Sequence, residues 1–164
     1  MALTSTQIGT IGENLLVNAV MKASDGRLSP FQPYADDDGL DVLFYDKQTG
    51  NSVAIQLKCR TVTLYKAGTR ERGNVVHFGV RQATFRATRH TYLVAALISP
   101  DFSNFEALWL VPMEKLPEVA GNISGKWVIR ANKNRATTDR YSAYRCPSVT
   151  ELAGKIIAAC ESRG

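Results

Sequence analysis

The sequence lacks a long apolar run, a basic N-terminal segment and any regular spacing of cysteines. None of its 164 residues belongs to a run near the ~20 apolar residues that a membrane span needs. The N-terminus, MALTSTQIGTIGENLL, does not resemble a secretory signal. The cysteines, Cys59, Cys146 and Cys160, are odd in number and far apart, which fits neither a disulfide framework nor a zinc spacing. We therefore expect reduced thiols in a cytoplasmic protein that has no membrane partner.

The composition is that of an ordinary globular chain. Apolar residues make up 45% and charged residues 21% of the sequence. No internal repeat, low-complexity tract or interdomain linker interrupts it. We expect one domain over residues 1–164, long enough to bury a substantial core.

Charge is distributed unevenly along the chain. The net charge is +5, but residues 1–58 carry −3 and residues 59–164 carry +8. A compact acidic site within a basic surface is what a metal-dependent enzyme acting on a polyanion would need. A solvated basic surface without such a role is the alternative, and charge alone does not choose between the two.

The first expected element is a helix over residues 5–23. Ser5 or Thr6 can cap it, and Gly9 and Gly12 permit close approach of a neighbouring element. Its apolar stripe at helical spacing is formed by Ile8, Ile11, Leu15 and Ala19.

Residues 36–58 predict two strands joined by a turn at Lys47–Gly50. With this turn, residues whose numbers sum to 97 lie opposite each other, so Asp41 faces Gln56. Lys58 shares the face of Gln56, because side chains alternate along a strand. The other face has no polar residue and carries Val42, Phe44, Val53, Ile55 and Leu57.

The middle of the chain reads as loops around a second helix. Residues 24–35 are a loop with proline and glycine breakers. Residues 61–77 begin extended and continue as a loop, with Arg70 and Arg72 on a mobile tip. Residues 79–90 predict a short helix that carries Arg81, Arg86 and Arg89.

The last third predicts strands and a closing helix. Residues 92–98 are a continuous apolar run typical of a buried central strand, residues 107–111 form another strand, and residues 126–130 form a possible edge strand. Ser148 and Glu151 match a capping box that begins the last helix, whose apolar face is Leu152, Ala153, Ile156, Ile157 and Cys160. The order α, β, β, β, α, β, β, a possible β and α favours an α/β fold, with a central mixed sheet flanked by helices.

Glu13 on the helix, Asp41 on a strand and Gln56-x-Lys58 on the next strand resemble the PD-(D/E)XK nuclease superfamily. The matched pieces are IGENLL (11–16), DDDGLDVLF (36–44) and IQLK (55–58). The resemblance implies a restriction-endonuclease-like α/β/α sandwich. It also implies an endonuclease that hydrolyses DNA phosphodiester bonds with a divalent metal.

The resemblance also implies roles for these residues. Asp41 and Gln56 would ligate Mg²⁺, for which Mn²⁺ can substitute, and Glu13 would hold a metal-bound water. Lys58 would orient or deprotonate the attacking water, or offset the charge that grows on phosphorus. Asp38 would assist the metal, although a solvated acidic turn at residues 36–38, ending at Gly39, is the favoured reading.

Gln56 departs from the superfamily, most members of which have Asp or Glu there. An amide binds a metal more weakly and removes one negative charge. The departure leaves open a DNA-binding protein on the same fold that has weak or no catalysis. A protein-interaction domain with a merely solvated hairpin face is a third reading.

Basic residues around the motif are candidates for phosphate contact, although each one alone reads equally as a surface charge. His77 and His90 have the chemistry of bases but no partners nearby in the sequence. We expect DNA as the partner, and a homodimer is an open expectation because cutting both strands needs two sites. The candidates for nucleic-acid binding are Arg81, Arg86, Arg89, Arg70 and Arg72.

Overall fold

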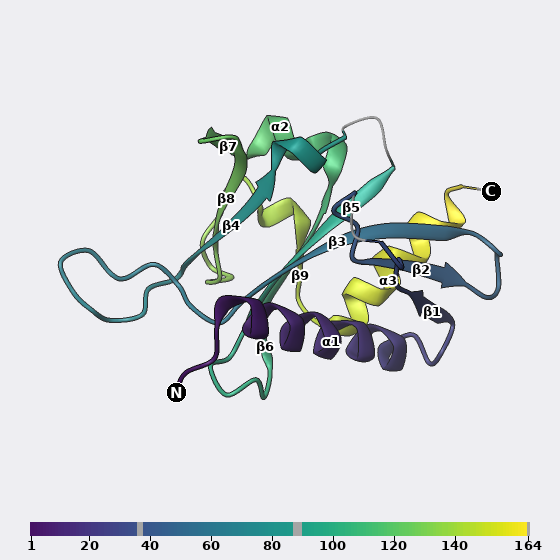
Figure 1. Ribbon diagram of the computed structural model, residues 1–164, viewed down its shortest axis with the longest axis horizontal. Helices are drawn as coiled ribbons and strands as arrows, with labels where there is room; N and C mark the ends of the chain where they lie inside the picture. The colour runs from purple at the N-terminus through teal and green to yellow at the C-terminus, as the bar shows by residue number, and fades with distance from the viewer. Residues whose placement is uncertain (36–37, 87–89, 164) are drawn as a thin grey trace.

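A computed structural model describes residues 1–35, 38–86 and 90–163 (Figure 1). Its elements in chain order are α1 (Ser5–Ala23), β1 (Leu28–Phe31), β2 (Val42–Asp46), β3 (Ser52–Arg60), β4 (Val75–Arg81), the 3-10 turn η1 (Gln82–Thr84), β5 (Thr91–Ile98), β6 (Phe105–Pro112), η2 (Met113–Lys115), α2 (Leu116–Val119), β7 (Gly121–Ile123), β8 (Lys126–Asn132), η3 (Ser142–Tyr144), β9 (Arg145–Cys146) and α3 (Val149–Glu161).

The main sheet is mixed, as expected. Within the described part of the chain its strand order is β1-β2-β3-β5-β6-β9. β3 and β5 run parallel, and every other neighbouring pair runs antiparallel. β5 lies between β3 and β6 and is buried over most of its length, which confirms the central strand predicted from its apolar run.

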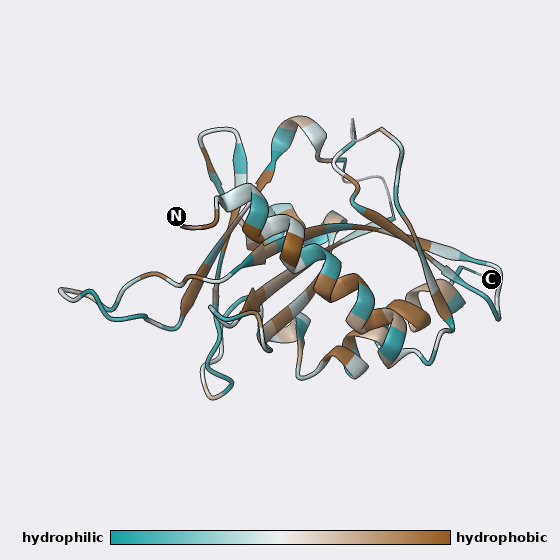
Figure 2. Cartoon of the chain, turned by 60° about the horizontal axis from the view of Figure 1, so that its bottom comes forward, coloured by the Kyte–Doolittle hydropathy of each residue, from teal (hydrophilic) through white to brown (hydrophobic). Residues whose placement is uncertain are grey.

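Helices α1 and α3 cover one face of the main sheet (Figure 1). The predicted helix over 5–23 is confirmed, but its cap is Thr4, which forms a capping box with Gln7. The predicted stripe is wrong, since Leu15 is 36% exposed. The buried residues of α1 are Gly12, Leu16, Val17 and Val20. In Figure 2 the apolar colour gathers on the strands and on the helices packed against them.

A small sheet of β4, β8 and β7 covers the opposite face of the main sheet. The predicted helix over 79–90 is therefore wrong in its described part, where Val75–Arg81 is a strand and η1 follows it. Alternating Val76, Phe78 and Val80 point inward and form this second core with the main sheet. β8 lies in the middle of the small sheet rather than at an edge.

The predicted register of the hairpin is confirmed. β2 and β3 pair as Val42↔Ile55, Leu43↔Ala54, Phe44↔Val53 and Tyr45↔Ser52, so each pair of numbers sums to 97. The face predicted to be apolar is buried in the core beneath α1 and α3.

The hairpin has two features that the sequence did not reveal. Residues Leu28–Phe31, expected within a loop, form β1 at the edge of the sheet, where Pro30 is tolerated. Asp46 continues the supposedly apolar face and is fully buried. It accepts hydrogen bonds from Arg27 Nε and Nη2, both at 2.8 Å.

The C-terminal helix α3 begins as predicted, because Ser148 accepts a hydrogen bond from the Glu151 backbone. Residues Cys160 and Leu152 are fully buried against the sheet. Among the described residues, no helix is both long and apolar enough to cross a membrane.

Candidate active site

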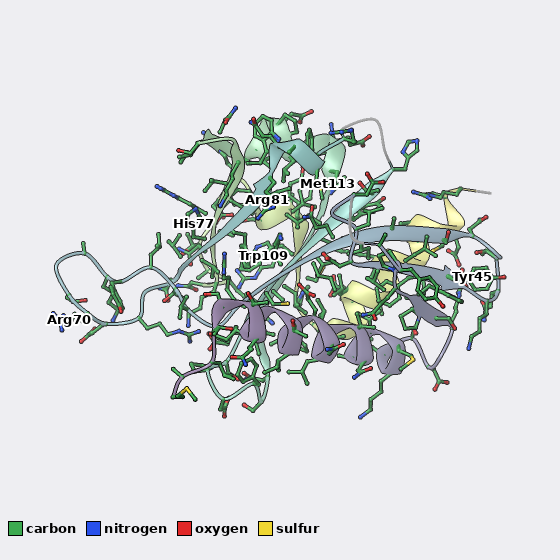
Figure 3. All side chains as sticks on the ribbon, in the orientation of Figure 1. Tyr45, Arg70, His77, Arg81, Trp109 and Met113 are labelled. Atoms are coloured by element: carbon green, nitrogen blue, oxygen red, sulfur yellow. The ribbon has the colours of Figure 1, made fainter. Side chains whose placement is uncertain are left out.

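A pocket of about 520 Å³ opens where α1, the β2–β3 hairpin and the end of β4 meet. Its polar groups include two carboxylates, an amide, an ammonium group and a guanidinium group. Arg81, labelled in Figure 3, stands at the end of β4 on its rim. The residues that line it are Thr6, Gly9, Thr10, Glu13, Gly39, Asp41, Gln56, Lys58, Arg81 and Thr84.

Helix α1 contributes one row of residues to the pocket. Thr6, Gly9, Thr10 and Glu13 recur at helical spacing and share a side of the helix. Sequence reasoning identified Glu13 but missed the two threonines, although their spacing from Glu13 carried that signal.

Gly12 sets how closely α1 approaches β3. A Cβ atom added at Gly12 would lie 2.7 Å from Cys59 Cβ and 2.9 Å from Ile98 Cδ1. Only a glycine fits this contact without displacement of the helix. The tight packing holds the next residue, Glu13, at the pocket.

Asp41 is fixed by the backbone of β3. Its N–H donates to the Ile55 carbonyl at 3.0 Å, and its Oδ2 accepts from the Leu57 N–H at 2.6 Å. Leu57 lies between Gln56 and Lys58, so the carboxylate is held beside both side chains. A hydrogen bond to a charged acceptor is among the stronger protein hydrogen bonds.

Gln56 and Lys58 reach the pocket from the same face of β3. Gln56 is buried and Lys58 is half-buried. On the parallel neighbour β5 they lie beside Leu93 and Ala95, which are fully buried. The amide and the ammonium group therefore stand between an apolar floor and the open pocket.

Gly39 and Thr84 close one side of the pocket. Gly39 has a φ of +68°, a conformation that favours glycine. A Cβ there would lie 2.9 Å from Thr84 Oγ1 and 3.5 Å from Gln56 Nε2. Asp38 beside it is exposed and does not line the pocket, whereas Asp36 and Asp37 lie outside the described residues.

The charges of the two carboxylates also affect the thiol of Cys59, which lies on the other side of β3. Burial raises the pKa of the Cys59 thiol to about 12, and the charges of Glu13 and Asp41 add to the rise. The charges of Lys58 and Arg60 oppose it. In the site, acidic and basic side chains therefore lie close together above buried apolar residues of β5.

The oxygen donors of the pocket suit a hard cation. Within the described residues, no group of three or more His, Cys, Asp and Glu side chains is placed to hold a metal. The pocket offers instead the carboxylates of Glu13 and Asp41 and the amide oxygen of Gln56. All three are oxygen ligands, the kind that Mg²⁺ binds while it keeps several waters.

The arginines expected to bind phosphate lie in different places. Arg81 lines the pocket, and Arg86 is exposed and donates to the carbonyls of Ala83 and Phe85. Arg70 is exposed on the loop that extends from the molecule in Figure 3. Arg72 is half-buried at the base of that loop, not at its tip, and Arg89 lies outside the described residues.

The histidines do not line the pocket. His77 is exposed on the outer face of β4, where it pairs in register with Arg130. His90 lines a separate cavity near the C-terminal end of α3, together with Tyr92 and Arg163.

No protein-family model and no curated protein sequence matches the chain. Among solved structures, it is similar to the bacterial homing endonuclease I-Ssp6803I, with a TM-score of 0.57 and 19% identity over 99% of this chain and 97% of that one. A Holliday junction resolvase, Hjc from Archaeoglobus fulgidus, gives a TM-score of 0.45 and 14% identity over 87% of this chain and 99% of that one. The likeness to the homing endonuclease confirms the restriction-endonuclease-like fold that the motifs indicated.

Proposed function

We propose that this chain is a divalent-metal-dependent endonuclease that hydrolyses phosphodiester bonds in DNA. One observation carries the proposal. Glu13, Asp41 and the Gln56–Lys58 pair come from three separate elements and line one pocket. A helix, a strand end and a neighbouring strand would not be expected to bring these groups together without a shared task.

The acidic half of the pocket would bind the metal. Asp41 and the side-chain oxygen of Gln56 would be direct ligands, and Glu13 would hold a water of the metal from the helix side. A bound Mg²⁺ would polarise the scissile phosphate and lower the pKa of a water. The hydrogen bond from Leu57 N–H holds the Asp41 carboxylate in place.

The basic half would act on the phosphate and the water. Lys58 would hold the attacking water, receive its proton, or offset the charge that grows on phosphorus. Arg81 on the rim would bind a phosphate oxygen through a planar group suited to that geometry. The apolar floor under Lys58 would strengthen these charge interactions.

The direct test is cleavage of labelled DNA in Mg²⁺ or Mn²⁺. The panel contains linear duplex, supercoiled circle, single strand and four-way junction, with EDTA and a Lys58→Ala protein as controls. The proposal expects cutting that is lost in both controls. Folded protein that cuts none of the four substrates with either metal would contradict it.

A second candidate function rests on Gln56. An amide in place of a carboxylate fits a DNA-binding protein of the same fold that has weak or no catalysis. This candidate expects salt-dependent binding without cutting, and a gain of cutting when Gln56 is replaced by Glu. The endonuclease expects cutting by the natural sequence.

A further inference from the structure

A row of basic residues leads away from the pocket along the outer face of the small sheet and onto β3. In register, Arg81 lies opposite Lys126, and His77 lies opposite Arg130. Arg60, two residues beyond Lys58 on the same face of β3, shares a groove of about 230 Å³ with His77. We name these five residues the basic strip; all five are exposed.

The positions of these residues make the strip continuous with the candidate site. Arg81 belongs both to the strip and to the rim of the pocket. His77 and Arg81 are four residues apart on β4, or about 14 Å along an antiparallel strand. Figure 3 shows Arg81, His77 and the loop residue Arg70 at successive distances from the centre of the molecule. The length of about 14 Å between His77 and Arg81 corresponds to about four base pairs along the axis of a DNA duplex.

The cations of the strip differ from other arginines of the molecule in their ion pairs. In the described parts of the chain, no ion pair engages Arg60, Lys126 or Arg130. By contrast, Arg27 and Arg72 are both paired with carboxylates. Cations that remain unpaired in a row are available to a polyanion.

His77 senses these charges. Although its side chain is exposed, partial desolvation lowers the pKa of His77, and the positive charges of Arg130, Arg60 and Lys126 lower it further. The charged side chains that act on the imidazole come from two elements, β3 and β8, and all are basic. A phosphate bound among these basic side chains would make the electrostatic potential at the imidazole negative instead of positive.

The groove at the end of the strip has an apolar wall. Val62 and Leu64, which are 65% and 43% exposed, line it beside Arg60 and His77. A groove with cations on one side and aliphatic groups on the other suits a chain of phosphates joined by sugars.

We propose that the basic strip binds the backbone of a DNA duplex on one side of the cleaved bond, with His77 seated against a phosphate. This inference rests on the proposed nuclease function, and it adds the surface along which the substrate lies. Arg60, Lys126, Arg130 and His77 had no expected role in DNA binding.

The first test measures affinity for a 20-base-pair duplex in EDTA, where metal-dependent cleavage cannot interfere. Lys126→Ala/Arg130→Ala is compared with Lys22→Ala/Lys47→Ala, which removes the same charge from exposed residues at the far end of α1 and in the β2–β3 turn. The strip variant should bind about tenfold more weakly at 0.1 M salt and lose about two units of log–log salt slope. Equal losses in both variants, or none in either, would overturn the proposal.

The second test measures the natural sequence, and a variant serves only to assign its signals. Because the chain has two histidines, NMR can follow each imidazole, with His77→Gln to assign the signals. DNA should raise the pKa of His77, and the His90 signal serves as the internal reference. Since binding then takes up a proton, affinity should rise as the pH falls through the range between the free and bound pKa values. An unchanged His77 pKa would overturn the proposal.

Together, the binding and cleavage results distinguish a failure of the basic strip from a failure of the proposed nuclease function. Binding that depends on the strip without any cutting would remove the proposed catalysis and keep the surface. Metal-dependent cutting by a strip variant that matches the control would keep the nuclease and remove the surface. Tighter strip-dependent binding of an RNA duplex of the same sequence would overturn the assignment to DNA.

Discussion

Gln56 gives the pocket a neutral oxygen where a carboxylate would bind a cation more firmly. Its burial beside Asp41 and Lys58 means that any change of charge there acts in a partly dry environment. In the proposed metal site this residue would set how strongly the metal is held, and it is the position where one substitution is most informative.

Gln56→Glu should lower the Mg²⁺ concentration needed for half-maximal cleavage, on the order of tenfold, because it adds a charged ligand. The measurement is the cleavage rate as a function of Mg²⁺. Gln82→Glu, which adds the same charge on η1 outside the pocket, is the control and should change the metal requirement little. Identical metal dependence in the natural protein and Gln56→Glu would argue against a ligand at this position.

Asp46 is important for stability rather than for chemistry. The hydrogen bond from Arg27 lowers the pKa of this carboxyl well below its usual range, although burial opposes the shift. It also accepts hydrogen bonds from Gln48 N at 3.0 Å and from Thr49 Oγ1 at 2.9 Å. Asp46 thus joins the β2–β3 turn to the residue that precedes β1.

Asp46→Asn should lower the free energy of unfolding at pH 7 by about 2–3 kcal/mol, since hydrogen bonds to a charged group are lost. Because the folded pKa is depressed, this contribution is present above the ordinary carboxyl pKa of about 4 and is lost as pH falls below it. Urea titrations from pH 7 to pH 3 should show the two proteins converging. A difference that stays constant over this range would contradict the charged pair.

At the scale of elements, the packing of α1 on β3 depends on Gly12. Gly12→Ala should destabilise the protein by about 1–2 kcal/mol, because overpacking outweighs the gain in helix propensity. Gly154→Ala on α3 is the matched control, since nothing lies within 4 Å of its added Cβ, and it should stabilise by about 1 kcal/mol. Thermal unfolding measures both, and stabilisation by Gly12→Ala would contradict the tight contact.

Elements with local signals were predictable from the sequence. The turn at Lys47–Gly50 fixed the hairpin register, and the structure places Asp41 and Gln56 in one pocket at the open end of that hairpin. The limits of α1 followed from its flanking signals, although its buried side did not. Apolar residues occur around much of that helix, and its closest contact is made by Gly12, which a search for apolar stripes overlooks.

The elements that were missed depend on distant partners. β4 spans the boundary between the loop expected over 61–77 and the helix expected over 79–90. The alternation of Val76, Phe78 and Val80 that marks it as a strand has meaning only against the second core. β1 was not predicted because it contains Pro30, and a proline is compatible with a strand only at a sheet edge. The convergence of Glu13 with Asp41, Gln56 and Lys58 was expected from the resemblance, whereas Thr6, Thr10 and the basic strip required the fold.

At the scale of the whole molecule, Glu106 joins the base of the 61–74 loop to two other parts of the fold. It accepts from Arg72 at 2.6 Å and from Lys133, which follows β8, at 2.9 Å. Burial alone would raise the pKa of Glu106, but these hydrogen bonds lower it. Arg72 also donates to the Thr61 carbonyl, so the guanidinium closes the loop at its base.

Glu106→Gln should loosen this loop and leave the main sheet intact. Backbone amides of Leu64, Lys66 and Gly73, which donate within the loop region, should exchange with solvent about tenfold faster, consistent with loss of about 1.4 kcal/mol of charged hydrogen bonding. Hydrogen exchange followed by NMR or mass spectrometry measures this change, with β5 amides as the internal control. Equal acceleration in β5 would mean global destabilisation instead.

The buried cysteines are natural probes of local opening, because their labelling rates depend on exposure to solvent. Cys59, Cys146 and Cys160 are free thiols in the core, and burial raises the pKa of each. Since the thiolate is the reactive form, all three should resist alkylation until the surrounding structure opens. Cys59 packs against Gly12 directly beneath the candidate site, so its rate of labelling would report the opening of α1 from β3 without any introduced probe.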